Sequence, residues 1–133
     1  MNNSDPLSKL IISESQEINK QELADLLNPY IAINKDSQSL DFFRAFRELG
    51  NEDKLYIVFA GIKTRNLLFA TGEKITPSEI IKMDIMPIGS VKGALKKLYD
   101  NGEVKSEKSK YFLPNYKLHQ VIAHFRDLNK IIK

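Results

Sequence analysis

The most apolar stretch of the chain lies near its middle and predicts a buried helix. Residues 52–69 read EDKLYIVFAGIKTRNLLF and contain few polar positions. A helix with large apolar residues on all of its sides is normally covered by neighbouring elements on every face. We therefore expect a largely buried central helix, with Asn51 as its N-cap and Gly72 at its end.

The pattern before this helix is weaker. Residues up to about 16 form a polar arm that we expect to be partly disordered. Apolar residues then follow helical spacing over 18–27, up to an Asn-Pro pair, and 30–33 reads as a short strand. Residues 40–42 fit either a returning strand or the start of another helix, because the phenylalanines that follow are also spaced helically.

Two short helices separated by a tight turn are predicted after the central helix. The stretch ITPSEIIKMD contains a capping box formed by Thr76 and Glu79, with Pro77 at the first helical position. The sequence DIMP, residues 84–87, breaks this helix before a second one begins at about 87–89. Such a pair of helices is what a helix-turn-helix unit requires.

The second of these helices has one apolar face and one face that carries lysines. At about 100° per residue, the apolar face holds Val91, Ala94, Leu95 and Leu98, which we expect to be buried. The opposite face holds Gly89, Gly93, Lys96 and Asp100, flanked by Ser90, Lys92 and Lys97. Glycine inside a helix costs roughly 1 kcal/mol relative to alanine. An outward Gly93 therefore indicates that a partner approaches its backbone closely, that it faces a neighbouring helix, or that it is merely tolerated.

A β-hairpin is predicted next. Asn101-Gly102 is typical of a left-handed helix end. Residues 104–106 and 110–113 then pair as strands around a basic and polar turn at 107–109.

The capped short helix, the turn, the helix ending in ALKKLYDNGEV and the hairpin together resemble the winged helix-turn-helix superfamily. The resemblance implies an α+β fold, mainly helical, in which residues 51–114 form the winged helix-turn-helix. Residues 1–50 would then be an N-terminal extension with an arm, a helix and a possible hairpin, and residues 115–133 a C-terminal amphipathic helix.

The resemblance also implies double-stranded DNA as the partner. Recognition helices of this kind enter the major groove and the hairpin, or wing, contacts the adjacent backbone. DNA would then meet Ser78, Lys82, Ser90, Lys92, Gly93, Lys96, Lys97, Lys108 and Lys110. The outward helix face has no Arg, Asn or Gln, the usual readers of base edges. We expect a DNA-binding transcriptional regulator, and the alternative is a winged-helix module for protein-protein contact that binds no DNA.

The last helix has an apolar seam with a spacing of three and four residues. It can pack on its own domain or pair with a second copy of the chain, and we favour a homodimer. The predicted dimerisation residues are Leu118, Val121, Ile122, Phe125, Leu128 and Ile132.

Charge is distributed unevenly along the chain, although its net value is only +3. Residues 1–73 hold 8 Lys and Arg against 11 Asp and Glu, whereas residues 74–133 hold 12 against 6. A basic C-terminal half favours a polyanionic partner, because Lys and Arg contacts to phosphate dominate affinity for nucleic acid. The alternative is a solvated lysine-rich surface.

Composition and motifs bear on the location of the protein and on whether it is an enzyme or a metal-binding protein. The chain has no cysteine, which favours a reducing cytoplasmic location, and we expect neither a leader peptide nor a membrane span. We find no metalloprotease HExxH, phosphate loop or nucleophile elbow. His119 and His124 are five residues apart and do not form a metal-binding pair on a helix. We therefore expect no catalytic residues, metal, cofactor or small-molecule ligand.

Overall fold

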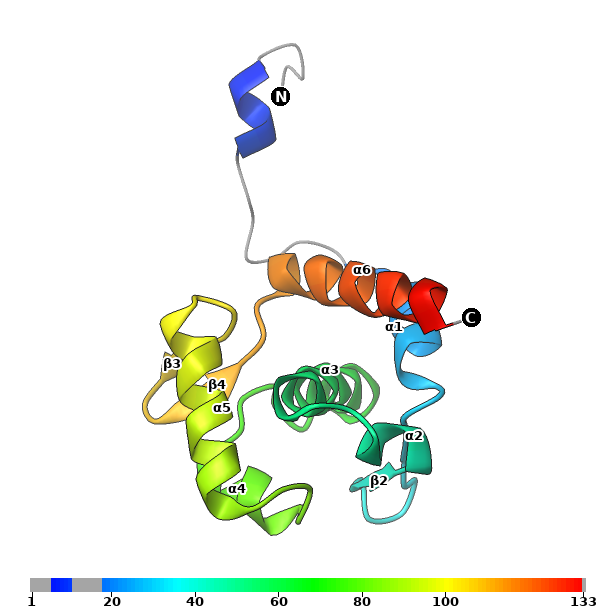
Figure 1. The fold of residues 1–133 in the computed structure, drawn as a ribbon, viewed down its shortest axis with the longest axis vertical. Helices are drawn as coiled ribbons and strands as arrows, with labels where there is room; N and C mark the ends of the chain where they lie inside the picture. Colours follow the sequence, from blue (N-terminus) through cyan, green and yellow to red (C-terminus); the bar gives the residue numbers. More distant parts are fainter. Residues whose placement is uncertain (1–5, 11–17, 133) are drawn as a thin grey trace.

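The structure is a computed structural model that describes residues 6–10 and 18–132. It is an α+β fold, mainly helical, with two small antiparallel sheets of two strands each. Most of the arm that was predicted to be partly disordered lies outside the described residues, and Pro6–Leu10 form a short 3₁₀ helix, η1 (Figure 1). Within the described ranges, no helix combines the length and the apolar character that a membrane crossing requires.

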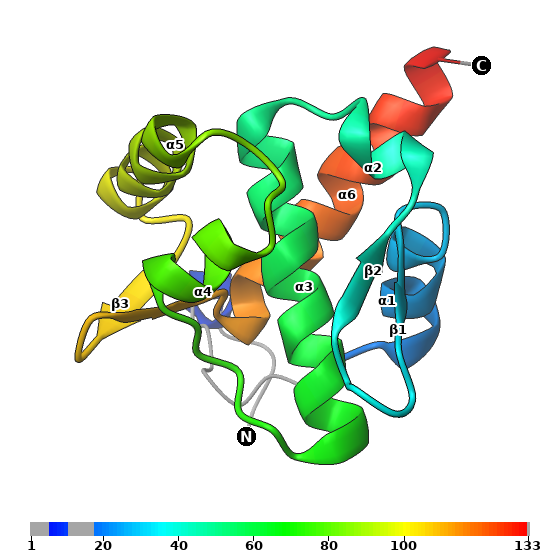
Figure 2. The same cartoon turned by 90° about the horizontal axis from the view of Figure 1, so that it is seen from below.

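Helix α3, Asn51–Phe69, is the axis around which the other elements pack (Figure 2). Its side chains are buried almost without interruption from Leu55 to Lys63. The central helix is thus confirmed, but its last residues are not buried as predicted. Leu67, Leu68 and Phe69 are 45%, 63% and 36% exposed, because the helix extends beyond the elements that cover it.

The predicted ends of α3 were each displaced by a short distance. Gly50, not Asn51, is the N-cap, because its extended backbone places its carbonyl to accept from the N–H of Lys54 at 2.9 Å. Ala70, not Gly72, ends the helix in the left-handed conformation. Gly72 follows with a positive φ, and its N–H donates to the side-chain oxygen of Asn66 at 2.9 Å.

The N-terminal part covers one side of α3 with a helix and a hairpin. Its elements are α1 (Lys20–Leu27), β1 (Ile31–Ile33), β2 (Leu40–Phe42) and the single turn α2 (Arg44–Arg47). The uncertainty over residues 40–42 resolves as a strand, since Ile33 pairs with Leu40 and Ile31 with Phe42. Gly61 lets this hairpin lie directly on α3: a Cβ there would come within 2.8 Å of the Ile31 side chain and 3.1 Å of Leu40.

The opposite side of α3 is covered by α4 (Pro77–Lys82) and α5 (Ile88–Asp100), followed by the hairpin β3 (Lys105–Glu107) and β4 (Lys110–Phe112). The apolar face predicted for α5 is confirmed. Its four residues are at most 9% exposed: Val91, Ala94, Leu95 and Leu98. Gly102 continues from α5 with a positive φ, and the N–H of Glu103 donates to the carbonyl of Leu98 at 2.9 Å, which confirms the left-handed helix end.

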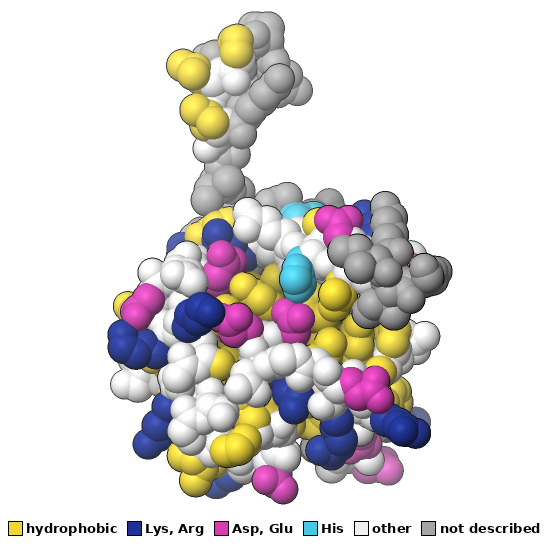
Figure 3. All heavy atoms as spheres, viewed as in Figure 1, with side chains coloured by type: hydrophobic (Ala, Val, Ile, Leu, Met, Phe, Trp, Pro, Cys, Tyr) yellow, Lys and Arg dark blue, Asp and Glu magenta, His cyan; other side chains and the backbone are white. Residues whose placement is uncertain are grey.

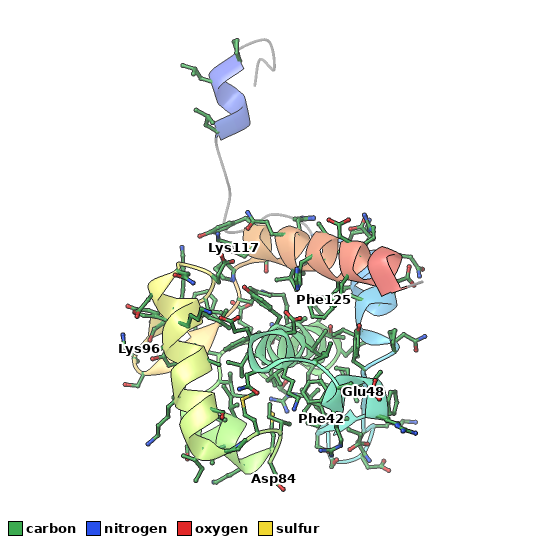
Figure 4. The ribbon with its side chains drawn as sticks, viewed as in Figure 1. Phe42, Glu48, Asp84, Lys96, Lys117 and Phe125 are labelled. Carbon is green, nitrogen blue, oxygen red and sulfur yellow. The ribbon has the colours of Figure 1, made fainter. Side chains whose placement is uncertain are left out.

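Helix α6, Asn115–Ile132, packs on its own chain. Phe125 points from α6 toward the interior (Figure 4) and makes an edge contact with Tyr30, with ring centroids 5.7 Å apart. Four residues of the predicted dimer seam are buried in this core, namely Leu118, Val121, Ile122 and Phe125. Leu128 packs against the same core, and the side chain of Ile132 lies outside the described residues.

This burial corrects the assignment of the α6 seam. Apolar side chains that already fill the core of one chain are not available to a second copy without partial unfolding. The seam therefore gives no reason to place a dimer interface on α6, and homodimerisation itself remains a prediction.

One hydrophobic core joins the three predicted segments. It runs from Leu23 in α1 through α3 and α5 to Phe125 in α6. From residue 18 onward, the parts of segments 1–50, 51–114 and 115–133 that the structure describes therefore form one packed body, whereas η1 contributes no residue to this core.

A buried lysine adds a polar connection within this body. Lys63 of α3 is 2% exposed, and its ammonium group lies 2.8 Å from a carboxylate oxygen of Glu73. It also donates to the side-chain oxygen of Asn115, at the start of α6. Because a buried charge must be paired to be tolerated, Lys63 holds the segment after α3 and the first turn of α6 in place.

The packing of α5 on α3 can be tested at Leu98, which is 2% exposed. Leu98→Ala should lower the free energy of unfolding by about 2 to 5 kcal/mol, because it leaves a cavity in the core. Urea denaturation followed by circular dichroism measures this. Leu68→Ala, at an exposed position of α3, is the control and should change stability little. Equal stability of Leu98→Ala and wild type would mean that the buried face of α5 is wrongly assigned.

Candidate nucleic-acid interface

The hairpin β3–β4 is attached to the segment before α4. The N–H of Ile75 donates to the carbonyl of Tyr111 at 2.9 Å, and the N–H of Tyr111 donates to the carbonyl of Ile75 at 2.8 Å. Lys74 reinforces this attachment through an ion pair with Glu107 at 2.8 Å. Along the chain, α3 is followed by Ile75, then by α4 and α5, and then by the hairpin. Because Ile75 pairs with Tyr111 of β4, the hairpin is fixed to the segment that leads into α4.

The turn between α4 and α5 is also well anchored. The capping box is present: the Thr76 hydroxyl accepts from the N–H of Glu79 at 3.1 Å, and the Glu79 carboxylate accepts from the N–H of Thr76. Asp84 takes a left-handed conformation, with φ 55°, which reverses the chain. The ammonium group of Lys54 donates to the carbonyl of Ile85 at 3.1 Å and so ties the turn to α3.

The face of α5 opposite its buried residues is exposed, and at Lys97 it reaches the start of α3. Figure 4 shows Lys96 on this outer side. Gly93 is exposed, and a Cβ built on it would meet no atom within 4 Å; the same holds for Gly89. Among the described residues, Gly93 is not packed tightly against another helix, but it borders a hollow that Asn51 and Glu52 at the start of α3 also line. Close approach of a partner and simple tolerance both remain as its explanation.

The lysines of this face differ in their pairing. Lys96 is 2.6 Å from Asp100, and Lys97 is 3.1 Å from Glu52 at the start of α3. The hydrogen bond from Lys96 to Asp100, assisted by the charge of that carboxylate, raises the lysine pKa. Lys92 and Lys82, both exposed, have no ion-pair partner within the part of the chain that the structure describes.

The hairpin presents a basic tip. Glu107 pairs with Lys110, so Lys108 and Ser109 form a two-residue loop, and both have positive φ, 52° and 65°. Two positive φ angles are typical of a type I′ turn, whose twist matches that of the flanking strands. Neither residue is the Gly or Asn that usually occupies such a turn. Lys108 and Lys110 are exposed. Tyr111 on β4 makes an edge contact with Tyr99 on α5, with ring centroids 5.9 Å apart, so the hairpin packs against the end of the helix.

An acidic cleft borders this surface. It is lined by Glu52, Asp53, Tyr56, Glu103, Gln120, Val121 and His124. Burial raises the pKa of Tyr56 to about 12, with further contributions from Glu103, Glu52 and Asp53. His124 lies 3.0 Å from Asp53, and Figure 3 shows a histidine beside acidic side chains near the centre of this face. Across the described ranges, no three His, Asp or Glu side chains are grouped so that they could hold a metal ion.

The nine predicted DNA-binding residues lie on three elements, namely α4, α5 and the β3–β4 hairpin. Ser78 and Lys82 lie exposed on α4, and Lys108 and Lys110 lie at the hairpin tip. The others lie on α5: Ser90, Lys92, Gly93, Lys96 and Lys97. Sequence reasoning missed Glu52, whose pairing with Lys97 joins residues 45 positions apart and leaves no local pattern.

Comparison with protein families, curated proteins and solved structures found no match for this chain.

Gly93 offers a test of the open helix face that does not depend on function. Gly93→Ala should raise the free energy of unfolding by about 0.5 to 1 kcal/mol, because alanine is the better helix former and the new methyl group meets open space. Urea denaturation of the two proteins measures the difference. A destabilised variant would show that Gly93 faces a surface of the folded chain.

Proposed function

We propose that this protein binds double-stranded DNA as a winged helix-turn-helix, with α5 in the major groove and the β3–β4 hairpin on the adjacent backbone. The observation that carries the proposal is the exposed, lysine-bearing face of α5, together with the exposed Lys82 of α4 and the basic tip of the hairpin that packs against α5. A role in transcriptional regulation, and assembly as a homodimer on two half-sites, extend the same proposal.

The order of elements supports it. A helix, a short bridging strand segment, a capped helix, a turn, a second helix and a hairpin is the order in which the helix-turn-helix and its wing occur. The contacts at Ile75 and Tyr111 fix the hairpin beside α5, so that one partner surface can contact both.

The charges support it as well. Exposed ammonium groups of Lys82, Lys92, Lys108 and Lys110 have no carboxylate partner among the described residues and are available to phosphate oxygens. The acidic cleft around Tyr56 sets a limit on this surface, because phosphate is repelled there. The footprint therefore runs along α5 toward the hairpin and away from the first turn of α3.

The first test is the salt dependence of duplex binding by Lys92→Ala. Each phosphate contact releases about one counterion, so the slope of log K against log salt should become less steep by about 0.9. Binding to unrelated duplexes should weaken alike, since a phosphate contact carries no base information. Fluorescence anisotropy over a salt series measures both.

Lys35→Ala is the matched control, because it removes an exposed lysine from the loop between β1 and β2. It should leave the slope unchanged. Equal slopes for Lys92→Ala and wild type, with both proteins folded by circular dichroism, would place Lys92 off the DNA.

A second test uses the ion pair that holds Lys97. Glu52→Gln should tighten duplex binding at low salt, because it removes a carboxylate beside the proposed path of the phosphates and frees the Lys97 ammonium group. Glu48→Gln changes the net charge equally at the exposed α2 end, where Glu48 pairs with Arg44 at 3.7 Å. Tighter binding by both variants to the same degree would reduce the effect to net charge.

The alternative of a protein-docking module is favoured by one observation, the exposed apolar end of α3. Leu67, Leu68 and Phe69 are adjacent there and lie on α3 beyond its buried part. Several large apolar side chains exposed within one helical turn are more typical of an interaction site than a single one is. This function would be preferred if no duplex binds at low salt while the protein is folded.

A further inference from the structure

An exposed isoleucine opens the proposed recognition helix. Ile88 is the first residue of α5, and its side chain is 56% exposed. Other apolar residues of this helix are buried against α3, apart from Tyr99, whose ring contacts Tyr111. Ile88 therefore presents a branched apolar side chain to solvent at the end of α5 where helix-turn-helix proteins contact base edges.

The residues next to Ile88 allow DNA to approach the helix closely, but few of them can form hydrogen bonds with base edges. A Cβ built on Gly89, the next residue, would meet no atom within 4 Å, so a groove can approach the backbone there. Ser90 and Lys92 are the polar side chains of the same half of the helix. The exposed part of α5 has no Arg, Asn or Gln, so it lacks the bidentate readers of guanine and adenine.

The chemistry that remains on this surface matches one feature of the major groove. Thymine is the base that carries a C5 methyl group there, and apolar side chains recognise it by contact. An isoleucine at the helix start, followed by a glycine that allows the backbone to come close, fits such a contact. Contact with a hydrated phosphate would not stabilise Ile88, because an apolar side chain gains free energy only when it leaves water for an apolar surface.

We propose that Ile88 contacts the C5 methyl group of thymine and gives this protein a preference for A·T-containing sites. The inference rests on the proposed DNA binding and adds the residue and the base feature that determine specificity. Lysine contacts to phosphate then supply most of the affinity, and the methyl contact supplies discrimination.

The test compares two alternating duplexes of equal length, one of dA and dT and one of dA and dU, which differ in the thymine methyl group alone. In the alternating polymer every register offers the methyl group, so the preferred sequence need not be known. Wild type should bind the dT duplex roughly fourfold more tightly for each methyl group that it contacts, the value of one buried methyl group. Ile88→Ala should bind both duplexes with nearly equal affinity.

Two controls separate the methyl contact from other effects. Leu68→Ala removes an exposed apolar side chain far along α3 and should keep the wild-type preference for dT. Alternating duplexes of dG with cytosine or 5-methylcytosine present the same methyl group in a different base pair. Wild type should prefer the methylated form, and Ile88→Ala should not.

The outcomes are distinct. Equal binding of the dT and dU duplexes by wild type overturns this inference and leaves DNA binding intact. A preference for dT that survives in Ile88→Ala overturns the assignment to Ile88. Absence of binding to every duplex at low salt overturns the proposed function, and the inference with it.

Discussion

Burial of α3 on all sides is the constraint on which the rest of the fold depends. A helix that is apolar around its whole circumference cannot be covered by a single neighbour, and here α1 with the β1–β2 hairpin, α5, and α6 cover it from different directions (Figure 2). This close packing depends on particular residues of α3, as Gly61 and Lys63 show. The glycine makes room for Ile31 and Leu40, and the lysine is tolerated at 2% exposure because Glu73 and Asn115 surround its charge.

The surface of α5 follows from that burial. Once Val91, Ala94, Leu95 and Leu98 face α3, the lysines and glycines of the helix must point outward, because the two sets alternate with the helical period. The Ile75–Tyr111 bridge then sets the hairpin beside the same helix. The position of the candidate interface is therefore a consequence of core packing.

Two of the lysines on α5 are paired with carboxylates of the same chain. Asp100 and Glu52 pair with Lys96 and Lys97, so a phosphate bound as proposed would compete with a carboxylate for each of them. Exposed ion pairs of this type are worth little in water. A polyanion can therefore displace the carboxylates at small cost.

The sequence alone determined the elements whose signals are local. The capping box of Thr76 and Glu79, the helical apolar face of α5 and the hairpin after Gly102 each depend on residues within a few positions of one another, and the structure contains all three. Exact helix ends were less predictable, because Gly50 and Ala70 act through backbone conformation rather than through side-chain type. The outward position of the candidate site residues on α5 could be predicted for the same reason as its buried face.

Tertiary structure decided whatever depends on which surfaces meet. The apolar seam of α6 has the same pattern whether it packs on its own chain or on a second copy, and the contact of Phe125 with Tyr30 shows that the chain itself fills it. Residues 40–42 became a strand because Leu40 pairs with Ile33 and lies on Gly61. Lys63 and Lys97 likewise find partners that are distant in sequence. Periodicity identifies an apolar or charged face, but which surface covers that face is decided by the packing of the whole chain.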